Sequence, residues 1–255
     1  MRWWNVGFLT EKHPVGWTAG MRTLVVEAVP ALTTHQMREV DRIMVEDLHI
    51  ELTQMMEKAG RGLADLAMRR FAPATVVVLA GPGGNGGGGL VGARHLANRG
   101  AAVSVVASSA DHEMTPAAAH QLDIVRCMGL HVTAEPGPVE LVVDALIGYS
   151  LRGDPVGRVA DLIDWTNAAG ADVLSLDVPS GLDATTGRAA NPCVAATATL
   201  TLALPKLGLL SAQQAGELYL ADISVPSVVY ERMGIVVPKL FTEDGLIELR
   251  RSPVP

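Results

Sequence analysis

Residues 75–107 read TVVVLAGPGGNGGGGLVGARHLANRGAAVSVVA, and this stretch decides the fold class. It contains two apolar, β-branched runs, at 75–80 and 102–107, which predict strands. Between them lie a glycine-rich segment and a run with helical spacing of apolar residues. A strand, a helix and a strand in this order form a βαβ unit, and strands that are apolar throughout belong to parallel sheets covered on both faces.

The same alternation of strands and helices continues along the chain. Thr33 and Gln36 form a capping-box pattern ahead of apolar residues at helical spacing, which predicts a helix start. We therefore expect one three-layer α/β/α sandwich with a mostly parallel sheet. Further helices are expected at 52–70, 90–100, 116–128 and 156–169, and further strands at 141–145, 172–176, 197–204 and 217–223.

Length and composition fit one large domain. The chain has 255 residues, of which 49% are apolar and 18% are charged, enough to bury one sizeable core. We expect residues 1–30 to be a partly flexible N-terminal extension, and residues 1–20 to be either a flexible segment or no part of the native protein. Residues 31–242 are expected to form the α/β domain, and residues 243–255 a polar tail.

Composition also excludes several classes of partner. The net charge of −7 would repel nucleic acid on average. Cys127 and Cys193 are the two cysteines, and the seven histidines lack metal-ligand spacing, which argues against a disulfide framework or a zinc site. The sequence shows neither an export signal nor an apolar run of membrane-spanning length. We therefore expect a cytoplasmic protein with no nucleic-acid or membrane partner.

Seven of the nine residues at 81–89 are glycine, and we expect a loop there that meets a helix at Leu90. Glycine permits positive φ and close approach of a ligand, and a helix N-terminus attracts phosphate, so a phosphorylated ligand is predicted. A tight structural turn is the alternative interpretation. Gly81, Gly83 and Gly86 match a dinucleotide fingerprint, but residues 81–110 contain no Asp or Glu to hold a ribose, which disfavours an NAD-dependent dehydrogenase.

Two carboxylates stand at the ends of later predicted strands. Asp144 ends one apolar run and Asp177 follows another. Open α/β sheets bind ligands at the carboxyl ends of their strands, so an acid/base or cation site is predicted there. The alternative is that each carboxylate caps a turn or a helix.

These segments, in this order and spacing, resemble the NAD(P)H-hydrate epimerase family, also called the YjeF N-terminal domain. The resemblance covers residues 33–234 and includes the segments 56–60 and 199–208. It implies a Rossmann-like sandwich, commonly a homodimer, which interconverts the R and S forms of hydrated NADH and NADPH in nicotinamide-cofactor repair. Because the chain ends at Pro255, the dehydratase that consumes the S form is expected to be a separate protein.

The resemblance also implies a set of site residues. Asp177 would be the catalytic acid/base, giving a proton to the departing hydroxyl and taking one from the incoming water. A potassium ion would be held by Asn85, Asp144 and Ser180. The substrate would contact Gly84, Asn85, Gly86, Gly87, Gly88, Gly148, Tyr149, Ser150, Leu151, Arg152, Gly153, Asp154 and Asp177.

The sequence departs from the family pattern at three positions. Gly84, Gly88 and Lys58 stand where the family has Asn, Asp and Asn. These changes motivate a second hypothesis, a non-catalytic nucleotide-binding or scaffold homologue with the same fold. Lys58 is expected either to compensate near phosphate or to be a solvated surface residue, and Arg152 and Lys206 are weaker phosphate candidates. His95 is expected to be a helix-surface or packed residue, with contact to the ligand as the alternative. No residue identifies a preference for NADH or NADPH hydrate.

Overall fold

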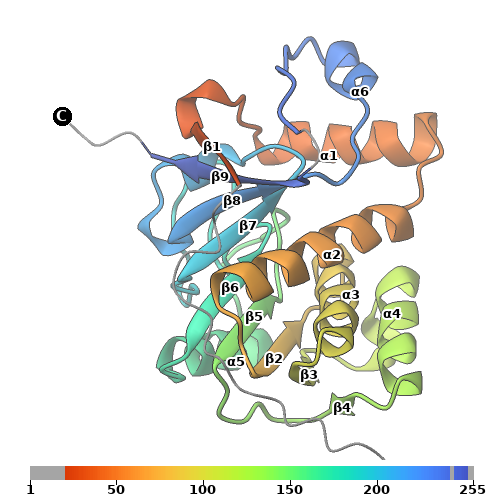
Figure 1. The fold of residues 1–255 in the computed structure, drawn as a ribbon, viewed down its shortest axis with the longest axis vertical. Helices are drawn as coiled ribbons and strands as arrows, with labels where there is room; N and C mark the ends of the chain where they lie inside the picture. Colours follow the sequence, from red (N-terminus) through yellow and green to blue (C-terminus); the bar gives the residue numbers. More distant parts are fainter. Residues whose placement is uncertain (1–20, 242–243, 252–255) are drawn as a thin grey trace, which may run out of the picture.

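The structure is a computed structural model that describes residues 21–241 and 244–251. Over these residues the chain forms one nine-stranded sheet with the order β1-β9-β8-β7-β6-β5-β2-β3-β4 (Figure 1). The described neighbours pair in parallel except β8 with β9. The strands are β1 (Arg22–Val25), β2 (Thr75–Ala80), β3 (Ala102–Ala107), β4 (His131–Val132), β5 (Leu141–Ala145), β6 (Asp172–Leu176), β7 (Ala198–Leu202), β8 (Glu217–Ala221) and β9 (Leu246–Arg250).

Helices cover both faces of this sheet. The helices α2, α3 and α4 lie side by side against one face, and α5 lies against the other (Figure 1). The predicted mostly parallel α/β sandwich is confirmed. The helices are α1 (Thr34–Arg42), α2 (Leu52–Arg70), α3 (Gly84–Asn98), α4 (Pro116–Cys127), α5 (Gly157–Ala168) and α6 (Ser227–Arg232), and a π-helical turn, η2 (Ile43–Asp47), extends α1.

The interior strand β2 has an apolar sequence because both of its faces are buried. Val76 and Val78 are fully buried in the core shared with α2 and α3. Val77 and Leu79, which point to the opposite face, are fully buried in the core shared with α5. Burying one such side chain contributes about 1.5–3 kcal/mol, so both layers gain from this strand.

Helix α1 begins where its capping box predicts. The Gln36 backbone N–H donates to Thr33 Oγ1 (3.2 Å), and the Thr33 N–H donates to Gln36 Oε1 (2.9 Å). The buried face of α1 and η2, including Met37, Val40 and Met44, packs in a core that also contains side chains of β8 and β9. This packing holds α1 near the carboxyl ends of β6 and β7.

The glycine-rich segment is helical, not a loop, so the predicted helix start at Leu90 is wrong. Helix α3 begins at Gly84, and no glycine at 81–89, all within the described chain, has a positive φ. A Cβ on Gly86 would lie 1.8 Å from the Gly81 carbonyl oxygen, and one on Gly89 would lie 2.4 Å from Ala145 Cβ. These glycines are therefore needed because the first turns of α3 press against the ends of β2 and β5.

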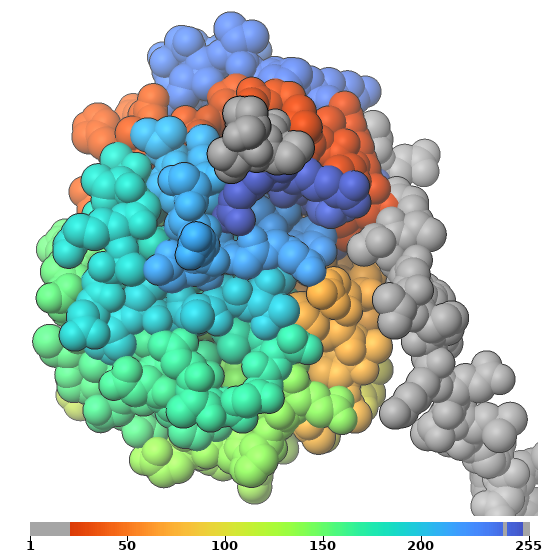
Figure 2. Space-filling model, turned by 90° about the vertical axis from the view of Figure 1, so that its left-hand side faces the viewer, coloured from red at the N-terminus to blue at the C-terminus, as the bar shows by residue number. Residues whose placement is uncertain are grey.

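The sheet extends past the predicted domain limits of 31 and 242. The first strand, β1, pairs with β9, and β9 pairs with β8. Figure 2 shows the dark-blue C-terminal residues between the red N-terminal segment and the lighter-blue residues on the surface. Both strands are short and carry charged residues, so their sequences gave little signal. Residues 1–20, expected to be flexible, lie outside the described residues.

Across residues 21–241 and 244–251, no helix has the length and apolar character needed to cross a membrane.

Candidate active site

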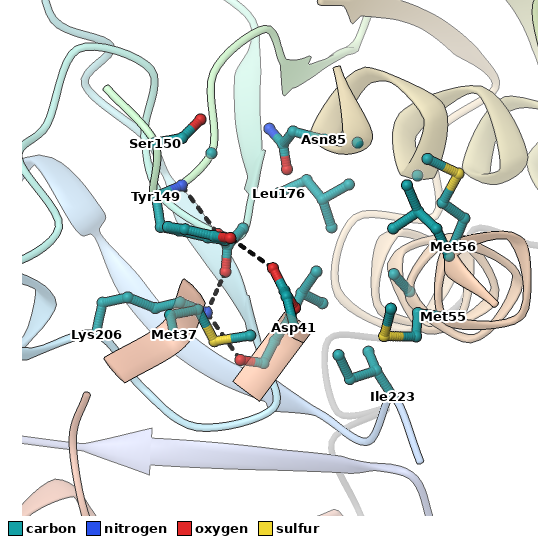
Figure 3. Close-up of a pocket in the computed structure, with 17 residues that line it drawn as sticks. Met37, Asp41, Met55, Met56, Asn85, Tyr149, Ser150, Leu176, Lys206 and Ile223 are labelled. Carbon is teal, nitrogen blue, oxygen red and sulfur yellow. Dashed lines mark hydrogen bonds and ion pairs between the residues drawn. The ribbon is translucent and has the colours of Figure 1, made fainter. Parts of the chain in front are cut away.

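A cavity of about 280 Å³ lies where β6 and β7 end and where α3 begins. Helices α1 and α2 and the segment after β5 complete its walls (Figure 3). Carboxyl ends of parallel strands and a helix N-terminus meet here, as in ligand sites of other open α/β sheets. Its lining is apolar at Met37, Leu52, Met55, Met56, Ala59, Leu176, Leu202 and Ile223, and polar at Asp41, Asn85, Ser150, Asp177 and Lys206.

Asp177 enters this cavity directly after β6. Its backbone has a left-handed φ of 70°, and its N–H donates to the Leu200 carbonyl (2.7 Å). The side chain is nearly buried: Oδ1 accepts from Lys206 Nζ, and Oδ2 accepts from the Tyr149 backbone N–H (3.1 Å). A left-handed backbone is uncommon outside glycine, although Asp tolerates it better than most residues. The surrounding bonds hold this conformation, which fixes the carboxylate at the cavity wall.

Lys206 is fully buried, and its ammonium group is satisfied inside the protein. Besides Asp177, Nζ donates to the Leu202 carbonyl (2.8 Å) and to Thr201 Oγ1 (3.4 Å). An ammonium group has three donors, and all three have protein acceptors. The charge of Lys206 is therefore paired with Asp177, and its donors are satisfied without a phosphate.

A second carboxylate, Asp41 of α1, also lines the cavity. The Tyr149 hydroxyl donates to Asp41 Oδ2 at 2.5 Å (Figure 3). Burial raises the pKa of Asp41 above its usual value, although the Tyr149 hydrogen bond and the charge of Lys206 act in the opposite direction. Burial also raises the pKa of Tyr149, so this hydroxyl keeps its proton. The sequence did not single out Asp41, since a polar residue on an amphipathic helix is unremarkable there.

Asp144 lies in the interior next to this site and does not line the cavity. Its carboxylate accepts from Ser175 Oγ (2.8 Å), from Ser180 Oγ (2.5 Å), from the Ser180 N–H (2.9 Å) and from the Leu146 N–H (3.3 Å). Burial raises the pKa of Asp144, and the Ser180 and Ser175 bonds oppose that rise. The structure thus brings together Asp144 and Ser180, two of the three expected cation ligands.

Asn85, the third expected ligand, lies in the first turn of α3 and lines the cavity. Its Nδ2 is buried and has no hydrogen-bond partner among the described residues. A Cβ on Gly148 would lie 3.2 Å from both Asn85 Oδ1 and Asp177 Oδ2, so glycine lets these two side chains approach the same point. Leaving a buried amide unsatisfied costs about 1–3 kcal/mol of folding free energy. A ligand in the cavity that accepts a hydrogen bond from Nδ2 would recover this cost.

The donor chemistry of Asn85, Asp144 and Ser180 fits a hard cation, because all three carry side-chain oxygen atoms. The unpartnered amide of Asn85 leaves that side chain free to turn its oxygen toward such an ion. No group of three or more His, Cys, Asp or Glu side chains that could hold a metal ion occurs in the described part of the chain.

Comparison with known proteins identifies the family of this chain. The family model for the YjeF-related protein N-terminus matches residues 52–208. The NAD(P)H-hydrate epimerase of Dehalogenimonas lykanthroporepellens is 45% identical over 217 residues, which cover 82% of this chain and 88% of that protein. The chain belongs to the YjeF N-terminal family.

Other relatives of this YjeF N-terminal chain include longer proteins. The bifunctional NAD(P)H-hydrate repair enzyme Nnr of Salinibacter ruber is 36% identical over 228 residues, which cover 80% of this chain but 42% of that enzyme. The crystal structure of yeast ynu0, YNL200c, matches with a TM-score of 0.77 and 22% identity, and the match covers 87% of this chain and all of that chain. The fold is thus shared well beyond close sequence similarity.

The cavity of this family member includes part of the predicted substrate set. Its lining contains Gly84, Asn85, Gly88, Gly148, Tyr149, Ser150 and Asp177. Gly86 and Gly87 are buried instead, where they pack against Gly81 and Met56. Leu151, Arg152, Gly153 and Asp154 follow in the loop outside the cavity lining, and the last three are exposed.

Lys58 and His95 lie outside the cavity of this family member. Lys58 is exposed and lies with His95 in a shallow surface depression formed by α2 and α3. The His95 ring nitrogen Nε2 lies 2.8 Å from Glu57 Oε1. His95 is therefore a helix-surface residue, as predicted, and Lys58 does not replace the family's Asn within the cavity.

Proposed function

We propose that this protein is an NAD(P)H-hydrate epimerase, an isomerase that interconverts the R and S forms of hydrated NADH and NADPH. The relatives that match over most of their length carry this activity in their names. The observation that carries the proposal is the Asp177 carboxylate, which is fixed at the cavity wall by Lys206 and by the Tyr149 N–H.

The substrate carries a hydroxyl on the carbon beside the ring nitrogen. Inversion proceeds when this C–O bond breaks and the nitrogen lone pair forms an iminium. Water then adds to the other face and the lone pair returns to nitrogen. The departing oxygen needs a proton and the incoming water must lose one, so positioned carboxyl groups accelerate these steps. Asp177 supplies such a group at the cavity wall, and its bond to Lys206 fixes Oδ1 so that the carboxylate cannot turn away.

The apolar wall of the cavity accepts the ring of the substrate. Met55, Met56 and Leu176 offer apolar surface near the polar Asn85 (Figure 3). Asp177 also lines the cavity. A volume of about 280 Å³ suits the hydrated nicotinamide end, so the rest of the dinucleotide lies beyond the cavity. Excluding bulk water from the ring limits unproductive reactions of the iminium.

A potassium ion is part of this proposal. Asn85, Asp144 and Ser180 would hold it, and when bound it would offset the negative charge of the substrate phosphates. The N-terminus of α3 attracts the same phosphates through its free backbone N–H groups.

The cellular setting is also proposed. The S form passes to a dehydratase activity, and the bifunctional relatives support such a link because they join two repair activities in one chain. A homodimer and a cytoplasmic location stay predictions from the resemblance and the composition.

The decisive experiment measures conversion of purified R-NADPH hydrate to the S form by chromatography, in potassium buffer, against the spontaneous rate. The expected result is acceleration that falls at least 100-fold in Asp177→Asn. Thermal unfolding must show that the variant is folded, since Asp177 is buried beside Lys206. Folded wild-type protein that gives no acceleration would refute the proposal and favour the scaffold hypothesis. That hypothesis is motivated by Gly84 and Gly88, which lack the polar side chains of the family pattern.

A further inference from the structure

Two carboxylates, not one, face the cavity, and they come from different elements. Asp177 follows β6, whereas Asp41 lies on α1. Their partners differ in charge: Asp177 is paired with the ammonium of Lys206, and Asp41 accepts from the neutral Tyr149 hydroxyl (Figure 3). A pair of carboxyl groups in contrasting environments is the arrangement by which one site supplies an acid and a base together.

The proposed reaction needs such a pair. The hydroxyl leaves from one face of a planar iminium and water adds to the other, so the proton donor and the proton acceptor act on opposite faces of the same carbon. A single carboxylate fixed on one wall reaches one face. The backbone and Lys206 bonds of Asp177 prevent it from crossing to the other.

We propose that Asp41, oriented by the Tyr149 hydroxyl, is the second acid/base of the epimerisation and acts on the face opposite to Asp177. This inference rests on the proposed epimerase function. The sequence motifs that resemble the family point to Asp177, and Asp41 is assigned here from its position in the cavity.

The charges around Asp41 suit this role. The Tyr149 hydroxyl, from the segment after β5, bonds to the Asp41 carboxylate. The charges of Lys206, after β7, and of Asp177, after β6, also influence Asp41. Arg38, on the same helix as Asp41, influences Tyr149 through its charge. The wall residues on α2 and after β8, Met55 and Ile223, are apolar. Burial and the Asp177 charge raise the pKa of Asp41, while the Tyr149 bond and Lys206 lower it. Asp41 therefore holds a proton more readily than an exposed aspartate.

The step balances with the two carboxyl groups in opposite protonation states. Protonated Asp41 gives its proton to the hydroxyl, the C–O bond breaks and water leaves as the iminium forms. A water molecule on the other face then bonds to the carbon, loses its proton to the Asp177 carboxylate, and the nitrogen regains its lone pair. The reverse reaction uses protonated Asp177 and ionised Asp41, and exchange with solvent restores the starting state.

The test uses ¹⁸O-labelled water, because it separates breaking of the C–O bond from inversion. The variants are Asp41→Asn and Asp177→Asn, and the matched control is Glu39→Gln, on the same helix but bonded to Arg42 outside the cavity. Inversion and incorporation of ¹⁸O into each epimer are followed by chromatography and mass spectrometry. Substrate affinity and thermal unfolding are measured for every variant.

The expected pattern is reciprocal. Asp41→Asn loses at least 100-fold in inversion but still exchanges oxygen, with retention, in the epimer whose hydroxyl faces Asp177. Asp177→Asn retains exchange in the opposite epimer, and Glu39→Gln behaves like wild type. Asp41→Asn that inverts within threefold of wild type overturns the inference alone. A folded, substrate-binding Asp41→Asn that loses exchange equally in both epimers also overturns it, since Asp41 would then only position other groups. Wild-type protein that neither inverts nor exchanges refutes both this inference and the epimerase function.

Discussion

Lys206 Nζ donates to Asp177 Oδ1 in a place where neither side chain has appreciable contact with solvent, since Lys206 is fully buried and Asp177 is 4% exposed. Such a pair gives little net stability over an apolar replacement, because both charges lose their hydration. Removing only one of the two side chains is strongly destabilising, because the remaining charge stays buried without a partner. The pair is therefore better explained by the site, where it fixes a carboxylate, than by stability.

Replacing one member of this pair should destabilise the fold strongly. We expect Lys206→Met to lower the free energy of unfolding by about 3–5 kcal/mol, as the Asp177 carboxylate loses its cation. The double variant Lys206→Met with Asp177→Asn should recover part of this loss, since no charge remains to be balanced. Urea denaturation of the two single variants and the double variant measures the coupling. Additive losses would contradict a direct interaction.

The glycines at the start of α3 give a prediction about packing. Gly86→Ala should destabilise the protein by about 1–3 kcal/mol, because the added Cβ collides with the Gly81 carbonyl, which is backbone and cannot move aside. Gly83→Ala is the matched control, since a Cβ there meets nothing within 4 Å. Denaturant unfolding of both variants measures the difference. Equal stability of the two would show that the first turn of α3 adjusts freely.

The α/β order was predictable because it depends on local pattern. Continuous apolar runs such as 75–80 and the Thr33 capping box carry their structure in a few adjacent residues. The glycine-rich segment was misinterpreted because helix propensity disfavours glycine, whereas tertiary packing against Gly81 and Ala145 requires it. The strands β1 and β9 were missed because β1, at the edge of the sheet, pairs with β9 from the opposite end of the chain, and because both strands are short and carry charged residues.

The site was only partly predictable for a similar reason. Asp144 and Asp177 stand out at the ends of strands, where the fold class itself places ligands. Asp41 carries no such signal, because it becomes part of the site only when α1 packs beside the end of β6. The role of Lys206 was hidden too, since the sequence does not show that its charge meets Asp177 instead of a ligand.

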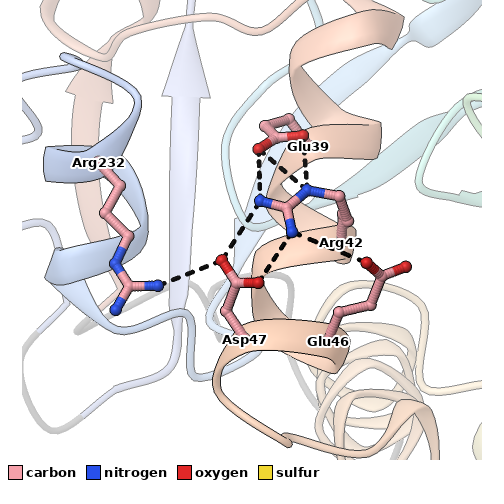
Figure 4. Close-up of polar contacts among 5 residues, drawn as sticks. All are labelled: Glu39, Arg42, Glu46, Asp47 and Arg232. Atoms are coloured by element: carbon pink, nitrogen blue, oxygen red, sulfur yellow. Dashed lines mark hydrogen bonds and ion pairs between the residues drawn. The ribbon is translucent and has the colours of Figure 1, made fainter.

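A network on the outer face of α1 predicts a dependence of stability on pH and salt. Arg42 bonds Glu39 and Asp47, and Asp47 also pairs with Arg232 of α6 (Figure 4). The Arg42 bonds lower the pKa values of Glu39 and Asp47. A carboxyl group whose pKa is lowered by folding stabilises the fold at pH values above its unfolded-state pKa. This stabilisation is lost as the pH falls through the folded-state pKa.

We therefore expect Arg42→Met to be slightly less stable than wild type near pH 7, with the gap closing as the pH falls below 4 or as salt rises. Thermal unfolding from pH 3 to 7 at low and high salt checks this. Arg61→Met is the control, because the Arg61 ion pair with Asp65 is longer, at 3.9 Å. A gap that persists at acid pH would mean that packing, not charge, explains the effect.

The Tyr149 hydroxyl should set the pH range of catalysis through Asp41. Its hydrogen bond lowers the pKa of Asp41, so Tyr149→Phe should raise that pKa further. Protonated Asp41 would then persist to higher pH, and the alkaline limb for the reaction direction in which Asp41 gives the proton should move upward. Initial rates of both directions from pH 5 to 9 measure this. An unchanged profile with a uniformly lower rate would indicate that Tyr149 only packs against the substrate.

Because the Asn85 amide has no described partner, we expect Asn85→Ala to preserve or raise stability while it weakens catalysis. Asn85→Ala removes a buried donor that no described residue satisfies, and alanine favours the helix, so the free energy of unfolding should stay the same or rise. Loss of the amide should raise KM for the hydrated dinucleotide and reduce any dependence of the rate on potassium, because Asn85 faces the cavity. Urea denaturation and initial rates in potassium and in sodium buffers measure both effects. A variant that is destabilised but kinetically normal would show that Asn85 serves the fold, not the ligand.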